Sequence, residues 1–468
     1  MMSGQAPDSG VPGLPALRVP GAHLVLDSIP GGHNSSLDAW SVGARRLALD
    51  FASRFPADWR IRSAFASDHR GVKWMGGGTL GSVGVVQKHV RLYYLDWMRV
   101  FAMLSVFLFH SDRFFVFDDW HVVNATRSLA STIHTDFFVQ WMMPLFFVLS
   151  GASIYYALQR RSGGQFIKER LLRLMLPLVT LGWFVLGPPQ IWLDRLTRGA
   201  FSGSFWQFYP TYFQGVDQFG GNFAWHGVHM WYLLYLFVLS LLWLPLMLPR
   251  KRTGVSLLAS ATPLFHRSWA LLLPALPLAA MDLLVNALDM GFMRGTGGWT
   301  LFSYLFFLPV GYLYFCTPKM QEAVRRFTWS ALALAVATSA LGLVMQYIWQ
   351  PPVAYGSWQY FGLILMRSVR ALCWVIAFLG LARRLLNFSN RFVRYANEAV
   401  LPFYILHQFV ILMVGYYGVI RLDLPILPKY LLVVILAFLG IMVPYELLIR
   451  RFNPLRVLFG MRPRRKAS

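Results

Sequence analysis

From Leu92 to about residue 450, long apolar segments alternate with short polar loops. Each segment holds about 17 to 22 residues, close to the roughly 20 that a helix needs to cross the hydrocarbon core of a bilayer. The pattern therefore predicts an all-α polytopic membrane protein whose helices form a bundle. We place ten transmembrane helices near residues 94–116, 137–158, 173–193, 229–248, 269–289, 300–317, 330–350, 360–382, 397–420 and 429–449.

The residues that precede these segments have a different character. Residues 1–90 are rich in Gly, Pro, Ser and Ala and have no sustained apolar period or signal-peptide pattern. This composition favours a disordered cytoplasmic tail, although translation from an internal Met such as Met75 would leave only a short Gly-rich lead. The prediction is thus a tail over 1–90, a ten-helix membrane domain over 91–450 and a basic cytoplasmic tail over 451–468.

Basic residues define the expected orientation of the helices. The loops after even-numbered helices are rich in Lys and Arg, and the loops after odd-numbered helices are poorer. Basic loops remain in the cytoplasm, so we expect both termini to be cytoplasmic. The basic residues in these loops are Arg160, Arg161, Lys168, Arg170, Arg173, Arg250, Lys251, Arg252, Arg267, Lys319, Arg325, Arg326, Arg383, Arg384, Arg391 and Arg394.

Composition agrees with a membrane protein. Of the 468 residues 13% are charged, whereas a soluble domain carries about 25%. The net charge of +23 would by itself suggest a nucleic-acid partner. Because the excess lies in the loops, we expect a lipid bilayer and no nucleic acid as partner. The two cysteines, Cys316 and Cys373, are too few for a disulfide framework and form no metal motif.

Arg99 and His110 stand eleven residues apart in the first apolar segment. This spacing is close to three helical turns, so both side chains lie on one face, about 16 Å apart along the axis. Ionisable residues inside a membrane are costly and usually mark a functional path. Asp96 precedes Arg99 by three residues and can neutralise it, so a purely structural pair is the alternative for Arg99. A structural hydrogen bond is the alternative for His110.

Five motifs together resemble the integral-membrane acyltransferase family 3. They are Leu95-Asp-Trp-Met-Arg99 followed by ten residues and His110, Pro144-Leu-Phe-Phe-Val-Leu-Ser-Gly151, Arg170-Leu-Leu-Arg173-Leu-Met-Leu-Pro177, His229-Met-Trp231, and Ala396-Asn-Glu-Ala-Val-Leu-Pro-Phe-Tyr404-Ile-Leu-His407-Gln. They occur in order between about residues 91 and 450, and the wording of the first and last is similar to the glucan-succinyltransferase branch. The 90-residue tail departs from the family pattern.

The resemblance implies an O-acyltransferase of the bacterial inner membrane. Members of the family transfer acetyl or succinyl groups from cytoplasmic acyl-CoA to extracytoplasmic glycans, lipids or antibiotics. We therefore expect acyl-CoA as donor substrate, a glycan or related hydroxyl compound as acceptor, and no bound cofactor. The acyl group, the acceptor and the oligomeric state stay open at this point.

Such a transfer suggests catalytic roles for His110 and Arg99. A base must take the proton of the acceptor hydroxyl, and histidine suits this role near neutral pH, so His110 is the candidate base. Arg99, paired with Asp96, is a candidate for holding the phosphates or pantetheine of the donor, because the guanidinium fork suits such groups. A path for the thioester arm from Arg99 to His110 is then expected.

Four further residues are candidates for substrate binding. Arg170 and Arg173 lie on the expected cytoplasmic face and suit the adenosine phosphates, with plain positive-inside anchoring as the alternative. His407 could support the acceptor or orient His110, or form a structural hydrogen bond. Trp231 could contribute to the site or belong to the interfacial aromatic belt.

Several other chemistries find little support in the sequence. No Gly-x-Ser-x-Gly elbow occurs, and Ser150-Gly151 suits close helix packing, so we expect direct transfer without an acyl-serine. No His-Glu-x-x-His motif occurs, so no metal is expected. A proton-coupled permease remains the alternative function, because buried Arg and His serve transport equally well.

Overall fold

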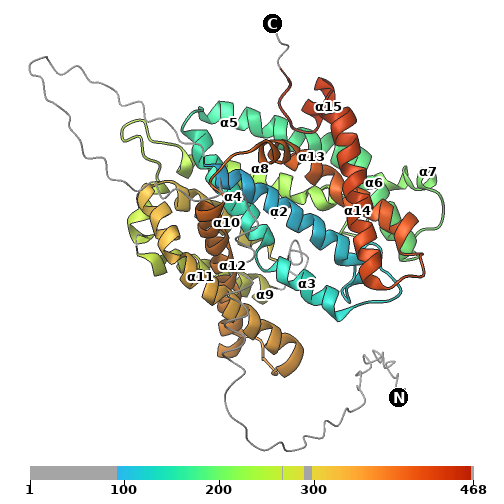
Figure 1. The fold of residues 1–468 in the computed structure, drawn as a ribbon, viewed down its shortest axis with the longest axis horizontal. Coiled ribbons are helices and arrows are strands. Elements are labelled where there is room, and N and C mark those ends of the chain that lie inside the picture. The colour runs from blue at the N-terminus through green and yellow to red at the C-terminus, as the bar shows by residue number, and fades with distance from the viewer. Residues whose placement is uncertain (1–91, 266, 289–297, 465–468) are drawn as a thin grey trace, which may run out of the picture. The chain divides into compact units, whose positions relative to one another are not determined.

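The computed structural model describes residues 92–265, 267–288 and 298–464 (Figure 1). Residues 1–90, predicted to form a tail, and the last four residues lie outside this range. The described part of the chain is helical and contains no β-strand. The predicted all-α fold class is therefore confirmed.

Each of the ten predicted segments corresponds to helix in the structure. The first five are α2 (Tyr93–Asp112), α4 (Met142–Leu158), the continuous stretch Gly163–Thr197, α8 (Trp231–Met247) and α9 (Ala275–Ala287). The other five are α10 (Tyr304–Phe315), α11 (Pro318–Val344), α12 (Trp358–Leu385), α13 (Arg391–Val414) and α14 (Ile426–Pro444). Shorter helices are α3 (Leu129–Val139), α5 (Gly163–Arg170), α6 (Gly187–Thr197), α7 (Phe205–Phe208) and α15 (Asn453–Leu458).

Eight helical stretches of the described residues are long and apolar enough to cross a membrane. They are Leu129–Leu158, Gly163–Thr197, Val228–Met247, Ser268–Ala287, Pro318–Trp349, Trp358–Leu385, Arg391–Val419 and Ile426–Ile449. The other two predicted spans are α10, which belongs to a shorter apolar stretch, and α2, which carries Asp96 and Arg99. The chain is thus an integral, multi-pass membrane protein, and the orientation of its termini stays a prediction.

Several helices begin earlier than the apolar pattern indicates. α11 starts at Pro318 rather than near residue 330, and α13 starts at Arg391 rather than near residue 397. Thr317 and Asn390 cap these helices by accepting hydrogen bonds from backbone amides three residues on. Hydropathy marks the part of a helix that lies in lipid, whereas the cap marks where the helix begins.

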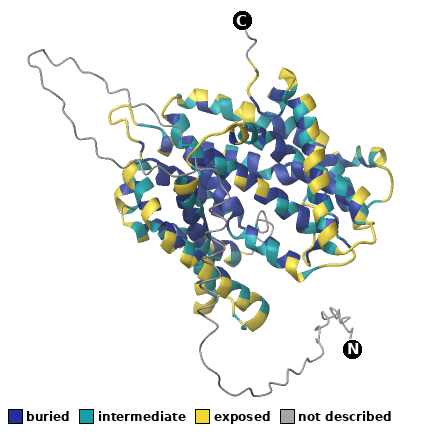
Figure 2. Ribbon diagram, in the orientation of Figure 1, coloured by how far each residue is buried: buried dark blue, intermediate teal, exposed yellow. Residues whose placement is uncertain are grey.

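Helix α2 lies at the centre of the bundle. It packs against α3, α4, α12, α13 and α14 (Figure 1), and most of its side chains are buried (Figure 2). By contrast α14 exposes a stripe of large apolar side chains, among them Leu431, Ile435 and Leu439. An exposed apolar stripe on a membrane-spanning helix faces lipid, whereas ionisable side chains inside a membrane usually face the interior of the bundle.

Two glycines bring α4 and α10 into direct backbone contact. A Cβ atom added at Gly151 would lie 2.0 Å from the carbonyl oxygen of Leu308, and one added at Gly311 would lie 2.0 Å from that of Val148. Neither position has room for a side chain. The expectation that Ser150-Gly151 serves close packing is confirmed for the glycine.

Candidate active site

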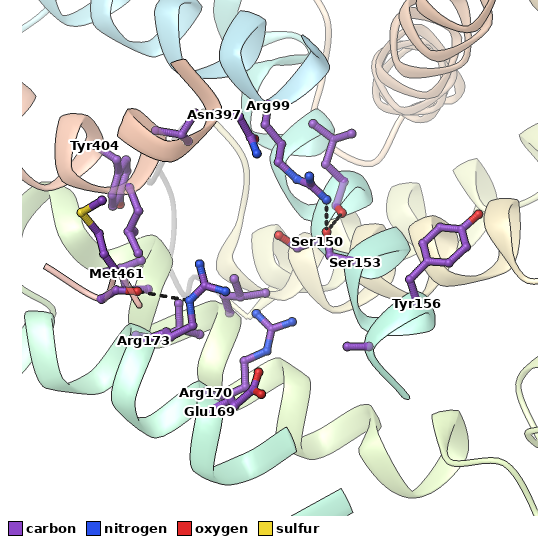
Figure 3. A pocket seen from close by; sticks show the side chains of 18 of the residues that line it. Arg99, Ser150, Ser153, Tyr156, Glu169, Arg170, Arg173, Asn397, Tyr404 and Met461 are labelled. Carbon is purple, nitrogen blue, oxygen red and sulfur yellow. Dashed lines mark hydrogen bonds between the residues drawn. The ribbon is translucent and has the colours of Figure 1, made fainter. Parts of the chain in front are cut away.

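A cavity of about 940 Å³ lies beside α2 and is strongly basic (Figure 3). Its walls come from α2, α4, α5 with the helical residues that follow it, α8, α13 and the C-terminal segment 456–462. Seven arginines and three carboxylates line it: Arg99, Arg160, Arg161, Arg170, Arg173, Arg456, Arg462, Asp96, Glu169 and Glu398. We call it the arginine cavity. Its excess of positive charge attracts polyanions.

Arg99 is fixed in this cavity by two neighbours. Its Nη1 donates to Asp96 Oδ1 at 2.7 Å, and its Nη2 donates to Ser153 Oγ of α4 at 2.9 Å. The predicted Asp96–Arg99 pair is therefore present. About a third of the Arg99 side chain remains exposed, so the guanidinium is both oriented and accessible from the cavity.

Arg170 and Arg173 also line the arginine cavity (Figure 3). The Arg170 guanidinium stacks on the Phe166 ring, 4.9 Å from its centroid, and donates no hydrogen bond to any described residue. Arg173 donates through Nε to the carbonyl oxygen of Gly460 at 3.2 Å. Both arginines therefore keep donors that can reach a ligand, since each guanidinium carries five.

Ser150 of α4, Tyr232 of α8 and Tyr404 of α13 line the arginine cavity together. Ser150 Oγ and Tyr232 Oη lie 2.6 Å apart. Tyr404 Oη donates to the carbonyl oxygen of His229 at 2.6 Å. Ser150 thus bonds a tyrosine rather than a histidine, so no base is paired with it as an acyl-serine mechanism would need.

Three histidines from three helical segments meet beyond Tyr404. The His407 ring lies 5.2 Å from the His110 ring and 5.0 Å from the His229 ring, measured between centroids. Tyr404 touches the same group, with its ring 5.5 Å from His407. We call His110, His229 and His407 the histidine cluster. Tyr404 thus contacts the histidine cluster and also lines the arginine cavity.

Backbone carbonyls fix the proton positions of two of these histidines. His407 Nδ1 lies 2.5 Å from the carbonyl oxygen of Tyr404, and His229 Nε2 lies 2.9 Å from that of Ile405. A carbonyl only accepts, so each of these nitrogens carries the proton and the other nitrogen of each neutral ring is an acceptor. Those acceptors, His407 Nε2 and His229 Nδ1, are buried and have no partner among the described residues, and the same holds for His110 Nδ1.

The structure separates two residues that the sequence predicts on one path. Arg99 lines the arginine cavity, whereas His110 does not, because Tyr404 lies at the boundary between the cavity and the histidine cluster. Trp231 packs against Tyr304, with ring centroids 5.3 Å apart, and does not line the cavity either. The role of Trp231 in substrate binding therefore stays a prediction.

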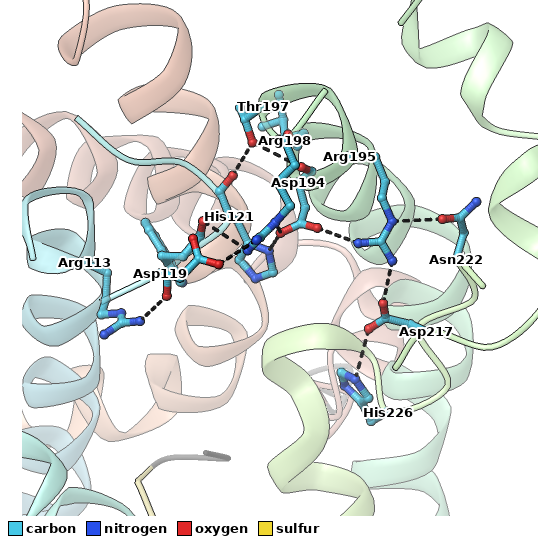
Figure 4. A network of polar contacts seen from close by, with 12 residues as sticks. Arg113, Asp119, His121, Asp194, Arg195, Thr197, Arg198, Asp217, Asn222 and His226 are labelled. Atoms are coloured by element: carbon cyan, nitrogen blue, oxygen red, sulfur yellow. Dashed lines mark hydrogen bonds and ion pairs between the residues drawn. The ribbon is translucent and has the colours of Figure 1, made fainter. Parts of the chain in front are cut away.

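A polar network joins the loop after α2 to α6 (Figure 4). Trp120 stacks near His110, with ring centroids 6.2 Å apart and planes 26° apart. The neighbouring His121 contacts Asp194 at 3.0 Å, and Arg198 bonds both Asp119 at 2.6 Å and Asp194 at 3.0 Å. These bonds tie the loop after α2 to α6 and hold Trp120 over the histidine.

The network continues into the loop before α8. Arg195 donates to Asp217 at 2.8 Å and to Asn222 at 3.1 Å, and His226 contacts Asp217 at 3.6 Å (Figure 4). Burial acts to raise the pKa of Asp217, but the bonds from His226 and Arg195 outweigh it, so the pKa lies below its ordinary value. Asp217 therefore stays ionised and holds the loop at neutral pH.

Sequence reasoning assigned no site role to several residues that the fold brings together. Arg456 and Arg462 lie about 290 residues beyond Arg170 in the chain, yet they line the same cavity, and Arg456 is anchored by Glu398 at 2.9 Å. His229 appears within a family motif but only the fold places it beside His407. In the sequence, the local signal for His229 was a histidine at the start of an apolar segment.

The described residues contain no group of three or more His, Cys, Asp or Glu side chains arranged to hold a metal ion. The side chains that line the site carry imidazole, guanidinium and hydroxyl groups. These groups offer proton transfer and anion binding.

Helices that cross the membrane, a basic cavity and a buried histidine cluster define a polytopic membrane protein with an internal polar site. Residues 92–446 match the family described as "Acyltransferase domain", and this chain belongs to that family. The predicted enzyme class, an acyltransferase that transfers groups other than amino-acyl groups, is confirmed, and the permease alternative is set aside.

Curated relatives are similar to most of the membrane domain. Proteins named "Glucans biosynthesis protein C" from Salmonella gallinarum (strain 287/91 / NCTC 13346) and Salmonella paratyphi B (strain ATCC BAA-1250 / SPB7) are each 25% identical to it over 334 residues. The matched region covers 70% of this chain and 84% of each relative. No solved structure matches the chain significantly.

Proposed function

We propose that this protein is an O-acyltransferase of a bacterial inner membrane. It moves an acetyl or succinyl group from cytoplasmic acyl-CoA to a hydroxyl of an extracytoplasmic glycan or related acceptor, with His110 as general base. The reaction class follows from the family. The names of the Salmonella relatives support a glucan as the acceptor class and a bacterial membrane as the location.

One observation carries the donor assignment: the arginine cavity holds seven arginines and three carboxylates. Acyl-CoA is a polyanion with phosphates at one end and a thioester at the other. Guanidinium groups bind phosphate with paired, charge-assisted hydrogen bonds, and Arg170 and Arg173 retain donors for them. The phosphates would then bind at these arginines, and the pantetheine arm would extend past Arg99 toward Tyr404.

The transfer step uses His110 as base and then as acid. His110 Nε2 takes the proton of the acceptor hydroxyl while the hydroxyl oxygen attacks the thioester carbonyl carbon. The C–S bond then breaks, an ester forms, and the protonated His110 gives its proton to the departing CoA sulfur. Two reactants held together by the site exchange one acyl group and one proton, and the enzyme returns to its starting state.

His407 lies next to the base, with 5.2 Å between the ring centroids, close enough for a small side-chain movement to bring the two rings into hydrogen-bond contact. Its Nδ1 proton is committed to the Tyr404 carbonyl, so Nε2 presents a lone pair inside the cluster. A proton on His110 Nδ1 would be favoured by that neighbouring acceptor, and His110 Nε2 would then be unprotonated and able to act as a base. This resembles the way a carboxylate sets the tautomer of the base in hydrolytic triads.

Tyr404 must move for the thioester to reach His110. Its side chain is buried, bounds the arginine cavity and contacts both His229 and His407. A hydrogen bond to the His229 carbonyl holds its hydroxyl. A rotation about that side chain would connect the cavity with the histidine cluster.

The test is turnover of acyl-CoA by purified protein in nanodiscs, with release of free CoA as the readout and a bacterial glucan extract as acceptor. We expect His110→Ala to lower kcat by about 100-fold or more, as the loss of a general base does. His407→Gln should lower kcat by a smaller factor and alter the pH profile, because it changes the orientation of His110 rather than removing the base.

The matched control is His134→Ala. His134 contacts Asp112 of α2 at 2.7 Å and does not belong to the histidine cluster, so its loss should leave kcat within a few-fold of wild type. If His110→Ala and His134→Ala release CoA at the wild-type rate, His110 is structural and the mechanism is wrong. If wild type transfers no acyl group from CoA but transfers one from another donor, the donor assignment fails.

A further inference from the structure

A second cavity has a volume of about 550 Å³. It shares no lining residue with the arginine cavity. Its walls come from α3 and the residues after it, the C-terminal end of α11 and its extension, and the first half of α12. None of its thirteen lining residues is buried, so it is open at the surface. We call it the Arg370 cavity.

Arg370 has fewer hydrogen bonds than its position requires. It lies within the membrane-spanning stretch Trp358–Leu385, and its Nη1 donates to the carbonyl oxygen of Thr338 at 3.2 Å. Its Nε is buried and has no partner among the described residues. A guanidinium has five donors, and an arginine inside a membrane is retained at a cost that usually reflects a function.

Gly342 allows this arginine to lie against α11. A Cβ atom at position 342 would sit 2.2 Å from Arg370 Nη1, so any other residue would displace the guanidinium. The glycine and the arginine both line the cavity. The absence of a side chain at Gly342 thus leaves room for the Arg370 guanidinium at the cavity wall.

Further donors surround Arg370. Arg367 lines the same cavity and stacks on Trp299 with its guanidinium carbon 4.3 Å from the ring centroid. Gln140 accepts a hydrogen bond from Ser339 Oγ at 2.8 Å through Oε1, which leaves its amide NH₂ as a donor. The cavity therefore combines two guanidiniums and two primary amides, of Gln140 and Gln346, with one carboxylate, that of Asp136.

The acidic groups near the cavity are already engaged. Asp136 accepts from Tyr347 Oη at 2.6 Å and from Gln346 Nε2 at 2.8 Å. Asp282 contacts Arg367 at 3.5 Å. No ion pair joins Arg370 to a carboxylate among the described residues, so its charge is not neutralised by direct contact.

We propose that the Arg370 cavity binds a phosphate-type oxyanion, carried by a membrane lipid or free in solution, with Arg370 as its main ligand. A phosphate offers several acceptor oxygens to the guanidinium fork. Exposed Trp349, Tyr355 and Trp358 lie at the ends of α11 and α12 nearest the cavity, and such aromatic residues mark the headgroup level of a bilayer. Arg370 itself lies twelve residues, about 18 Å, further along α12 than Trp358, so a lipid phosphate would have to enter the cavity from that level to reach it.

The experiment compares wild type with Arg370→Gln in the full chain. One arm places each protein in nanodiscs of phosphatidylcholine with and without phosphatidylglycerol, and counts bound phosphatidylglycerol by native mass spectrometry. The other arm adds inorganic phosphate to protein in phosphatidylcholine alone and follows the thermal midpoint. Charge-assisted hydrogen bonds contribute enough that their loss weakens binding about tenfold or more.

Two variants keep the result interpretable. Arg384→Gln removes a cation from the far end of α12, where its guanidinium stacks 5.5 Å from the Trp329 centroid, and should bind the anion as wild type does. Gly342→Ala keeps every charge but displaces the end of the Arg370 side chain, and should weaken binding in the same direction as Arg370→Gln but by a smaller factor. It serves as the second variant if Arg370→Gln does not fold.

Each outcome has a defined meaning. Loss of bound phosphatidylglycerol in Arg370→Gln or Gly342→Ala, but not in Arg384→Gln, supports the proposal with a lipid as the source. A phosphate-dependent rise in the midpoint of wild type that these two variants lack supports it with free phosphate as the source. Equal binding by wild type and both cavity variants in both arms overturns it, whatever the acyltransferase assay gives.

Discussion

Replacing Arg170 with alanine tests the proposal that the arginine cavity binds the phosphates of the donor. The Arg170 side chain makes one described contact, a stack on Phe166 with 4.9 Å between the guanidinium carbon and the ring centroid. Such cation–π contacts contribute about 0.5–1 kcal/mol at partly exposed sites, so the loss of fold stability should be no larger. The variant should therefore fold.

The expected loss in donor binding is larger than the loss in stability. A hydrogen bond to a charged group contributes about 1.5–3 kcal/mol, which corresponds to about 10-fold to 150-fold in affinity. We expect Arg170→Ala to raise KM for acyl-CoA by a factor in that range while kcat changes little, because the phosphates are bound equally in ground and transition states.

The assay compares two donors, acyl-CoA and the matching acyl-pantetheine, which lacks the nucleotide. Arg170→Ala should lower kcat/KM for acyl-CoA but leave kcat/KM for acyl-pantetheine near the wild-type value. Arg394→Ala is the control, because Arg394 is exposed on α13 and does not line the cavity. If Arg170→Ala lowers kcat/KM equally for both donors, Arg170 does not bind the phosphates and the reasoning fails.

Two other predictions test the packing and the outer loop. Gly311→Ala should destabilise the protein by about 1–3 kcal/mol, because the new Cβ would lie 2.0 Å from the Val148 oxygen. The control is Gly362→Ala, whose Cβ meets nothing within 4 Å, and it should not lower the thermal midpoint in the same detergent. Equal losses of thermal midpoint in the two variants would contradict this prediction. The pKa of Asp217 is affected first by burial, which raises it, and then by His226 and a neighbouring arginine, which together hold it below its ordinary value. Its contribution to stability is therefore present above the unfolded-state pKa, about 3.9, and is lost as pH falls through the lower folded-state pKa. Between about pH 5 and about pH 3 the midpoint of wild type should fall more than that of Asp217→Asn, and parallel curves would show that Asp217 adds no stability.

Local sequence patterns were sufficient to predict the helices and one contact of the site, the Asp96–Arg99 pair. Ten apolar segments gave ten helical segments, because the length of an apolar run is a property of neighbouring residues. The Asp96–Arg99 pair was predictable for the same reason, since residues three apart on a helix face each other. The starts of α11 and α13 were missed because polar caps, rather than hydropathy, fix where those helices begin.

The depth of His110 relative to the cavity was not predictable from helical spacing. Spacing places Arg99 and His110 on one face of α2, but only Arg99 lines the cavity, and Tyr404 of α13 both lines it and contacts His407 of the histidine cluster. Which side chain stands between two positions on one helix depends on how another helix packs against it. Spacing along α2 contains no information about α13.

By itself the sequence determined that this is a multi-pass helical membrane protein with an arginine and a histidine on its first helix, and its motifs resembled a family of acyltransferases. Only the tertiary structure decided that arginines some 290 residues apart line one cavity, and that His110, His229 and His407 meet. The physical reason is range: hydropathy and helical period act between neighbours in the chain, whereas a binding site is formed by close packing between helices that are distant in sequence.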